Sequence, residues 1–348
     1  MVGDAGARPL NRRRDYRQLD EDDVRVRPGR GSRPRTRRRP AHADAVGGFV
    51  TAVDRGRFTC LVDGMAVAAI KARELGRKGV VVGDRVAITG DVSGAVDTLA
   101  RIIRVEPRSS ALRRSADDTD PVERVIVANA QQLVIVSALA NPPPRPRLID
   151  RCLVAAYDAG LRPLLCLTKA DLAEPRDLLR TYEPFGLTCV VTRKPLRKRQ
   201  LNALSKLLRD QISVFVGHSG VGKSTLVNAL VPAADRAVAR VNPVTGRGRH
   251  TSSSAIAIPL AEGGWIIDTP GVRSFGLGHI ATGRVIHAFP DLEKGTKQCP
   301  PGCTHLQDDC GLDGWIAGQR GARERARLAK RLDSLRRLLY SLEGGDDD

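Results

Sequence analysis

Aromatic side chains are scarce in this chain, and long apolar runs are absent. Phe, Trp and Tyr together make up 3% of the 348 residues, so base stacking should not dominate a nucleic-acid interface. No apolar stretch approaches the roughly 20 residues of a transmembrane helix. The first residues lack an apolar signal segment. We therefore expect a cytoplasmic protein with no membrane partner.

Cysteine is infrequent too, and its distribution argues against a disulfide framework. Three of the seven cysteines lie between Cys299 and Cys310, which indicates a metal site in a reducing compartment. The other four follow strand or helix patterns and are expected to be small buried hydrophobic residues.

Acidic residues are outnumbered by basic ones, 39 to 57, which gives a formal net charge of +18. Clusters of Lys and Arg attract phosphate backbones, so a polyanionic partner such as RNA is expected. Residues 1–44 are rich in Arg, Pro and Gly and are predicted to form a disordered basic arm. This arm either lies on RNA or only keeps the chain in solution.

The rest of the chain is long enough for two or three domains. Residues 45–108 contain five short alternating runs separated by turn signals, which predict an all-β OB-like barrel that binds RNA or only packs on its neighbour. Residues 109–278 alternate strand and helix patterns, typical of a mostly parallel α/β sheet, after a polar linker at 108–120. Residues 279–348 are predicted to be mostly helical, with a basic amphipathic helix from Arg320 to Leu342.

A phosphate-binding loop stands in the middle of the α/β region. It follows the apolar run Ile212 to Val216 and opens into a helical pattern, so backbone N–H groups and a helix N-terminus point at an anion. Lys223 reaches the β- and γ-phosphates, and the Ser224 hydroxyl can ligate Mg²⁺. The residues predicted to bind the nucleotide here are Gly217, His218, Ser219, Gly220, Val221, Gly222, Lys223, Ser224 and Thr225.

Two further motifs narrow the nucleotide to GTP. Asp268-Thr269-Pro270-Gly271 ends a strand pattern, where Asp268 reaches Mg²⁺ through water and the Gly271 N–H bonds the γ-phosphate. Thr168-Lys169-Ala170-Asp171 ends another strand pattern. The Asp171 carboxylate can accept both N1–H and N2–H of guanine, which adenine cannot offer. The Lys169 stem can lie along the base.

The order of these motifs is unusual, because Thr168–Asp171 precedes the phosphate loop by about fifty residues. A circular permutation keeps the same pocket, since domain termini often lie close together. The permuted domain then ends just after the Asp268 motif, so the second switch leads directly into the C-terminal module.

A Cys/His cluster lies in that module. Cys299, Cys303, His305 and Cys310 offer three thiolates and one imidazole within twelve residues. This set fills a tetrahedral Zn²⁺ shell and leaves no open position, as in structural sites. The alternative is a group of incidental thiols. We expect one structural zinc ion per chain, which stabilises a module with little core of its own.

With these motifs, residues 45 to about 340 resemble the bacterial ribosome small-subunit-dependent GTPase A family, also called YjeQ. The resemblance implies GTP hydrolysis stimulated by the 30S subunit late in its assembly, with the barrel and zinc module on 16S rRNA. Arg247 to Thr251 resembles the first switch of the family, and we assign Thr251 to Mg²⁺ together with Ser224 and Asp268. Thr168 stands where Asn is commoner, and a guanine-backing loop is expected at Val191 to Arg193 without its usual Ser-Ala.

Catalysis requires a water molecule in line with the γ-phosphate. Val272 follows the Asp268 motif where other GTPases carry Gln, and its apolar side chain cannot orient water. We expect His250 to take this role when RNA orders the first switch, with Lys223 and Gly271 completing the catalytic set. His218 is the weaker candidate.

Three functions remain open from the sequence. The preferred one is a monomeric GTPase that binds the 30S subunit and leaves it after hydrolysing GTP to GDP. The second is an RNA-binding assembly chaperone that uses GTP only as a sensor. The third is a permuted GTPase acting on the 50S subunit, although such relatives generally lack the barrel and the Cys/His cluster.

Overall fold

The structure is a computed structural model, and it describes residues 44–76, 79–95, 97–114, 124–232, 255–269 and 282–342. The chain divides after Ala43 into two units, and every described residue belongs to the second. The predicted arm lies outside the described residues except for Asp44. So do three predicted site residues, His250, Thr251 and Gly271.

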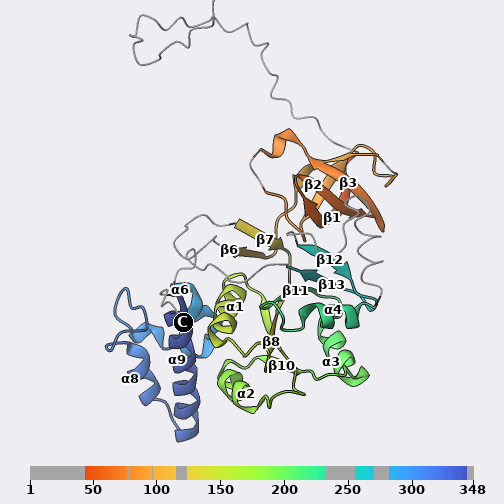
Figure 1. The fold of residues 1–348 in the computed structure, drawn as a ribbon. Coiled ribbons are helices and arrows are strands. Elements are labelled where there is room, and N and C mark those ends of the chain that lie inside the picture. Colours follow the sequence, from red (N-terminus) through yellow and green to blue (C-terminus); the bar gives the residue numbers. More distant parts are fainter. Residues whose placement is uncertain are drawn as a thin grey trace, which may run out of the picture. The chain divides into compact units, whose positions relative to one another are not determined.

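The order of elements follows the predicted change from β to α/β to helical texture (Figure 1). In the first part the strands are β1 (Val46–Asp54), β2 (Arg57–Val62), β3 (Met65–Lys71), β4 (Arg85–Thr89), β5 (Ala100–Val105), β6 (Ala111–Arg114) and β7 (Arg124–Ala128). The α/β part contains β8 (Gln132–Ala138), α1 (Pro146–Asp158), β9 (Arg162–Thr168), α2 (Arg176–Tyr182), η4 (Glu183–Phe185), β10 (Thr188–Val191), α3 (Lys198–Leu208), β11 (Ile212–Val216), α4 (Lys223–Leu230), β12 (Ile256–Pro259) and β13 (Trp265–Asp268). The last part contains α6 (Thr282–Val285), α7 (Pro290–Glu293), α8 (Gly311–Ala317) and α9 (Ala322–Leu342).

The first five strands close into a barrel. They pair in the order β1-β2-β3-β5-β4, and β4 pairs back to β1. All five predicted strands are present, with ends shifted by one or two residues at most. Alternation places one face of each strand inside, where Val50, Cys60, Val67 and Ile88 are fully buried. The predicted β-barrel is therefore confirmed.

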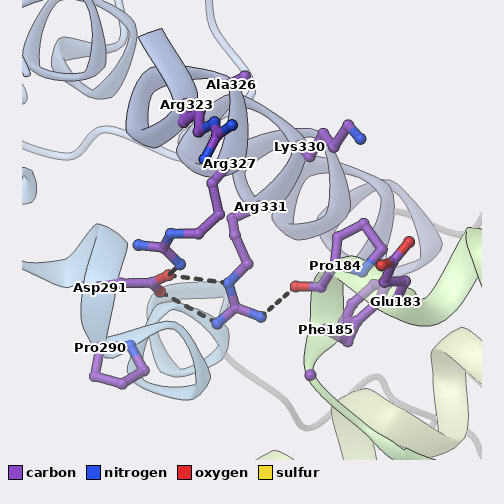
Figure 2. Close-up of a pocket in the computed structure, with 11 residues that line it drawn as sticks. Glu183, Pro184, Phe185, Pro290, Asp291, Arg323, Ala326, Arg327, Lys330 and Arg331 are labelled. Carbon is purple, nitrogen blue, oxygen red and sulfur yellow. Dashed lines mark hydrogen bonds and ion pairs between the residues drawn. The ribbon is translucent and has the colours of Figure 1, made fainter. Parts of the chain in front are cut away.

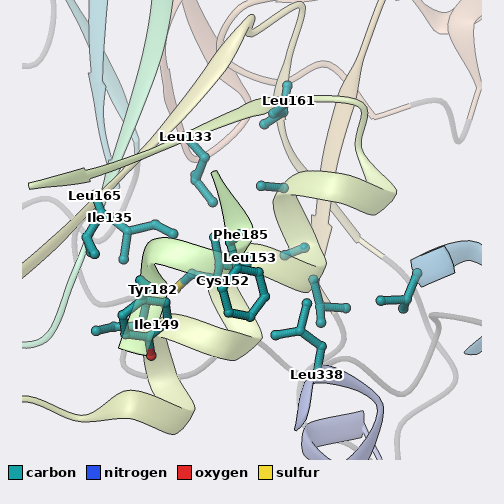
Figure 3. Packing of buried hydrophobic residues seen from close by; sticks show 14 of the residues in the cluster. Leu133, Ile135, Ile149, Cys152, Leu153, Leu161, Leu165, Tyr182, Phe185 and Leu338 are labelled. Atoms are coloured by element: carbon teal, nitrogen blue, oxygen red, sulfur yellow. The ribbon is translucent and has the colours of Figure 1, made fainter. Parts of the chain in front are cut away.

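The α/β part forms a mostly parallel sheet in the order β10-β9-β8-β11-β13-β12. Only β12 runs antiparallel, as the hairpin partner of β13. Successive residues of β8 point to opposite faces, so Leu133 and Ile135 join the core under α1, whereas Val134 joins the core under α3 and α4. Figure 3 shows the first of these cores. The predicted α/β sheet covered by helices is confirmed.

One expectation was wrong. Residues 111–114 were predicted to lie in a polar linker, yet they form β6, which pairs antiparallel with β7. Leu112 is buried in the core under α1, among its polar neighbours. Ser110 donates a hydrogen bond to the Ala130 carbonyl at 2.6 Å. A single buried leucine and backbone pairing thus decide the structure where composition indicated a loop.

The barrel and the sheet are joined through a close junction. The Asn129 amide donates to the Gly83 carbonyl at 2.8 Å, and its oxygen accepts the Ser109 N–H at 2.8 Å. Asp84 is fully buried and accepts two hydrogen bonds from Arg108, at 2.7 and 2.8 Å. These bonds satisfy polar groups that burial would otherwise leave without partners.

The predicted basic helix from Arg320 to Leu342 is present as α9. Its apolar side packs against α1 and η4, and Leu328, Leu335 and Leu338 belong to the same buried cluster as Leu153 of α1 (Figure 3). The C-terminal part therefore shares a core with the α/β sheet. Among the described helices, none combines the length and hydropathy that crossing a bilayer requires.

Candidate functional site

The predicted nucleotide motifs meet at one edge of the sheet. β9, β8, β11 and β13 are parallel neighbours, so their carboxyl ends lie side by side. Thr168 ends β9, Gly217 follows β11, and Asp268 ends β13. Ligands of open α/β sheets bind beyond this edge. The permuted chain order therefore leaves the three motifs together in space.

The phosphate loop approaches neighbouring backbone closely. A Cβ atom on Gly217 would lie 2.4 Å from the Val136 carbonyl oxygen, so no other residue fits there without a shift. Gly222 has a φ of 92° and precedes the first residue of α4, a conformation that glycine adopts without a steric penalty. The loop thus presents backbone N–H groups ahead of a helix N-terminus, as a phosphate requires.

Lys223 lies at the base of this loop. Its Nζ is 2.9 Å from Oδ1 of Asp268 and donates to the Thr269 carbonyl at 3.0 Å. Thr269 is buried and donates to the Phe215 carbonyl at 3.0 Å, which fixes the end of β13 against β11. The ammonium and the carboxylate are both largely buried. The two groups assigned to phosphate and to Mg²⁺ are thus in direct contact.

The guanine motif is bonded to the phosphate loop. Thr168 is buried, and its hydroxyl donates to the Val221 carbonyl at 2.5 Å. Asp171 is exposed, and its carboxylate accepts the Lys194 N–H at 2.8 Å. This hydrogen bond holds the pKa of Asp171 below its ordinary value, because it favours the charged form. The carboxylate is therefore ionised and positioned at neutral pH.

Sequence reasoning missed two neighbours of this site. Lys169 donates from Nζ to the Asn141 carbonyl, and Pro142 lies 3.5 Å from the position of a Cβ on Gly220. The Asn141–Pro144 run carries no nucleotide-binding motif that would have indicated this role. The Val191–Arg193 loop does lie beside the guanine motif, where the Thr192 carbonyl accepts the Ala170 N–H at 3.0 Å.

The remaining phosphate-loop residues are placed in sequence around Lys223. Ser219, Gly220, Ser224 and Thr225 are exposed to solvent. The His218 Nδ1 lies 2.9 Å from the Ser219 carbonyl of its own loop. Thr168–Asp171, Gly217–Thr225 and Asp268 are therefore gathered at one edge, whereas His250, Thr251 and Gly271 lie outside the described residues.

The predicted Cys/His cluster is also assembled. The ligand atoms of Cys299, Cys303, His305 and Cys310 all lie within 4.8 Å of one another. The three sulfur atoms are 3.6–3.7 Å from the His305 Nδ1. A tetrahedral zinc ion with ordinary bond lengths needs a sulfur–nitrogen separation of about 3.6 Å. The four residues therefore fit a metal ion of this kind.

The surroundings of His305 favour its neutral form. Burial and the nearby Arg336 lower the pKa of this imidazole, which keeps a nitrogen lone pair available for a metal. Arg336 itself donates to the His305 carbonyl at 3.0 Å and pairs with Asp313 at 2.5 Å. Because Arg336 lies on α9, it attaches the metal-binding loop to that helix.

Arginines also fix α9 to the rest of the protein. Arg331 pairs with Asp291 of α7 at 3.1 Å and donates to the Pro184 carbonyl at 2.7 Å (Figure 2). Arg337 pairs with the buried Asp150 of α1 at 3.0 Å. The C-terminal part is therefore held by ion pairs as well as by a shared core.

Comparisons with known proteins agree with this geometry. The family model for the RsgA GTPase matches residues 105–278. The small ribosomal subunit biogenesis GTPase RsgA of Ectopseudomonas mendocina is 40% identical over 243 residues, which cover 66% of this chain and 69% of that protein. The protein of the same name from Gemmatimonas aurantiaca is 38% identical over 237 residues, 66% of this chain and 75% of that one.

Two solved structures share the fold. YjeQ from Thermotoga maritima superposes with a TM-score of 0.61 at 25% identity, over 87% of this chain and 100% of that one. YloQ, a circularly permuted GTPase, gives a TM-score of 0.56 at 21% identity, over 86% of this chain and 98% of that one, which shows the fold alone. The N-terminal β-barrel precedes an α/β sheet whose nucleotide motifs lie at one edge. This chain belongs to the RsgA GTPase family and is a GTP hydrolase with the circularly permuted fold.

Proposed function

We propose that this GTPase acts in the biogenesis of the small ribosomal subunit. It binds the 30S subunit, hydrolyses GTP in response to that subunit late in maturation, and leaves after hydrolysis. The observation that supports the proposal is the hydrogen bond that the Thr168 hydroxyl donates to the Val221 carbonyl, which joins the two segments assigned to guanine and to phosphate. The relatives named above supply the cellular role, since their names assign them to small-subunit biogenesis.

The contact with the subunit rests on charge. A net charge of +18 suits an RNA-rich partner, and 16S rRNA is the polyanion of the small subunit. The barrel and the C-terminal part are the surfaces assigned to it. We expect one copy of the chain to act alone in the cytoplasm.

For catalysis, Lys223 neutralises charge that develops on the transferred phosphoryl group. Ser224, Thr251 and Asp268 are assigned to Mg²⁺, which neutralises the same charge when bound, and the Gly271 N–H to the γ-phosphate. His250 is assigned the attacking water, because Val272 has no group that can hold one. This makes turnover dependent on a partner that brings the first switch into place.

The Cys/His cluster is assigned one structural zinc ion, held by Cys299, Cys303, His305 and Cys310. The fit of their separations to a tetrahedral shell supports this assignment. All four positions are taken by protein atoms, so the ion has a structural role and no part in the hydrolysis.

Phosphate release is the experiment that tests the function. GTP hydrolysis is measured with the protein alone and with 30S, 50S or 70S particles, and stimulation by 30S particles is expected to be the largest. Equal or greater stimulation by 50S particles would move the proposal to the large subunit. Absence of stimulation by any particle would reject it.

His250→Ala tests the catalytic assignment separately. The variant should bind GTP as the wild type does and lose the stimulated turnover, because only the water is affected. Full stimulated turnover in this variant would remove His250 from the mechanism, and His218 would become the next candidate.

A further inference from the structure

A cleft of about 660 Å³ lies where the barrel meets the GTPase sheet. One wall comes from β1, β2 and β4 of the barrel. The other comes from the amino ends of β11 and β13, where Ile212 pairs with Trp265. This is the edge of the sheet opposite to the nucleotide motifs, so the cleft is separate from the GTP site. Ligand sites are frequent at such junctions between domains.

The two walls contribute one aromatic ring each. Phe49 of β1 and Trp265 of β13 have ring centroids 5.0 Å apart, at an interplanar angle of 44°. Both rings are only partly buried, so part of each remains open to the cleft. Only six Phe and two Trp occur in the whole chain. Aromatic side chains are therefore rare in this chain, yet two of them line this cleft. Together they offer an apolar surface on which a flat ring can stack.

The charges around the cleft exclude a phosphate cradle. Its charged lining consists of one cation, Arg85, and two anions, Glu106 and Asp210, in a chain whose net charge is strongly positive. Arg104 pairs with Glu106 at 2.8 Å, so the lining is left with one guanidinium and one carboxylate, and a single guanidinium beside a carboxylate does not make a phosphate cradle. Arg85 and Asp210 offer donors and acceptors to the polar edge of an uncharged ring, whereas the amides of Gln131 and Gln211 already bond groups of the protein.

Two observations indicate that the cleft can admit such a ring. Arg85 is exposed and has no side-chain partner among the residues that the structure describes. Gly47 is exposed, and a Cβ there would meet no atom within 4 Å. A ligand can therefore approach the β1 backbone and the guanidinium without displacing an existing contact.

We propose that this cleft binds one unpaired nucleobase of single-stranded RNA. The base stacks on Trp265 and Phe49, its polar edge faces Arg85, and its phosphates stay outside the cleft. The inference rests on the proposed function, because it says how the RNA partner is held. Sequence-tolerant stacking of this kind is typical of proteins that hold single strands.

Trp265 itself supplies the readout. In a Trp315→Phe protein it is the only tryptophan, and its fluorescence is titrated with a short single-stranded oligoribonucleotide. A matched oligoribonucleotide with abasic positions keeps the phosphates and lacks the bases. We expect saturable quenching by the first and none by the second, although both bind by charge. Wild-type protein with labelled oligoribonucleotides and anisotropy detection gives the same comparison if Trp315→Phe does not fold.

Gly47→Val tests the position of the ligand. The new side chain points into open space and suits a strand, so the barrel should fold while the cleft is filled. The apparent Kd for the base-containing strand should rise about tenfold, within the range that loss of one stacked base produces. Gly283→Val is the matched control, because Gly283 is also exposed with no atom near its Cβ and does not line the cleft.

Equal quenching by the abasic strand, or an unchanged Kd in Gly47→Val, would overturn the base site. Stimulation of GTP hydrolysis by 30S particles is measured on the same wild-type protein. If the fluorescence of Trp265 does not change with the base-containing strand while 30S particles still stimulate GTP hydrolysis, only the base-binding site in the cleft is rejected. Quenching by bases without any stimulation rejects the proposed function and leaves the cleft standing.

Discussion

The hydroxyl of Thr168 joins the segment proposed to recognise guanine to the segment proposed to bind phosphate. Thr168→Val keeps the shape of the side chain and removes the donor to the buried Val221 carbonyl. An unsatisfied buried acceptor costs about 1–3 kcal/mol, so the affinity for GTP should fall roughly tenfold. Titration with a fluorescent guanine nucleotide measures this. Thr181→Val, whose hydroxyl bonds the Asp177 carbonyl on exposed α2, is the control and should bind normally. Equal affinities in both variants would contradict the link.

Gly83 has a similar role at the junction of barrel and sheet. Its φ is 92°, and a Cβ would lie 2.0 Å from the Ala128 carbonyl oxygen. Gly83→Ala should therefore lower the free energy of unfolding by more than the roughly 1–2 kcal/mol of a left-handed alanine. Gly56→Ala isolates that smaller cost, since Gly56 has a φ of 84° and an open Cβ position. Urea unfolding of both variants makes the comparison. Equal losses of unfolding free energy in the two variants would show that the backbone at Gly83 shifts to accommodate the added methyl group.

At the same scale, the sequence predicted where the motif residues lie, and it did not predict which backbone groups surround them. Lys223, Asp268 and Asp171 carry recognisable motifs, and all lie at the predicted edge of the sheet. The Asn141 carbonyl that receives Lys169 has no such signal, because any residue supplies a carbonyl. The Lys194 N–H that donates a hydrogen bond to the Asp171 carboxylate has no sequence signal either, because almost every residue supplies a backbone N–H. Backbone groups of distant segments complete the pocket, and only the fold brings them there.

At the scale of elements, α9 is held to α1 by an ion pair whose carboxylate is buried and whose guanidinium is partly exposed. Arg337 lies 3.0 Å from Asp150 and stacks on Tyr182 and Phe185, with its Cζ 4.9 and 5.0 Å from the ring centroids. Arg337→Met leaves a buried carboxylate without its partner, which should cost about 3–5 kcal/mol of the free energy of unfolding at about pH 7. Asp150→Asn combined with Arg337→Met should recover most of this loss. Arg323→Met, an exposed change on the same helix, should be neutral.

The pH dependence of that variant follows from the pKa of Asp150. Burial raises this pKa, and Arg337 opposes the rise. When the pKa of a carboxyl is higher in the folded state than in the unfolded state, the protein loses stability as the pH rises from the unfolded-state pKa through the folded-state pKa. Because the pKa rises further without Arg337, Arg337→Met should regain stability as pH falls from about 7 to about 5. Urea unfolding at both pH values measures this, and a pH-independent deficit would contradict it.

The metal-binding loop is a second element whose order depends on a few groups. Cys303→Ser removes one of the four proposed ligands, so the expected bound zinc should fall from one ion per chain to near zero, and the thermal transition of this part should broaden and fall in temperature. Cys189→Ser is the control, since Cys189 lies on β10, far along the chain from the cluster. Elemental analysis after dialysis gives the zinc content. Full zinc content in Cys303→Ser would remove this residue from the site.

Elements were predictable where a pattern extends over several residues. β11 has the predicted limits, because an unbroken apolar run before a glycine loop has few alternatives. β6 was missed, because one buried leucine between a serine pair and two arginines carries little pattern. Its pairing with β7 depends on Asn129 and Val127 further along the chain. Short strands of this kind are set by tertiary contacts more than by local sequence.

At the scale of the whole molecule, the excess of basic residues should make the proposed binding to the 30S subunit dependent on salt. Each phosphate contact releases counterions, so a protein with 6–10 such contacts loses about 10³–10⁵ in affinity between 50 and 200 mM salt. Binding to 30S particles should follow this trend, measured by co-sedimentation with a non-hydrolysable GTP analogue. The affinity for GTP should change little by comparison, because its recognition rests on a few groups at one sheet edge. Removing residues 1–43, where arginine is densest, should flatten the salt dependence of subunit binding and leave GTP affinity unchanged. An unaltered slope would mean that the barrel and the C-terminal part make the phosphate contacts alone.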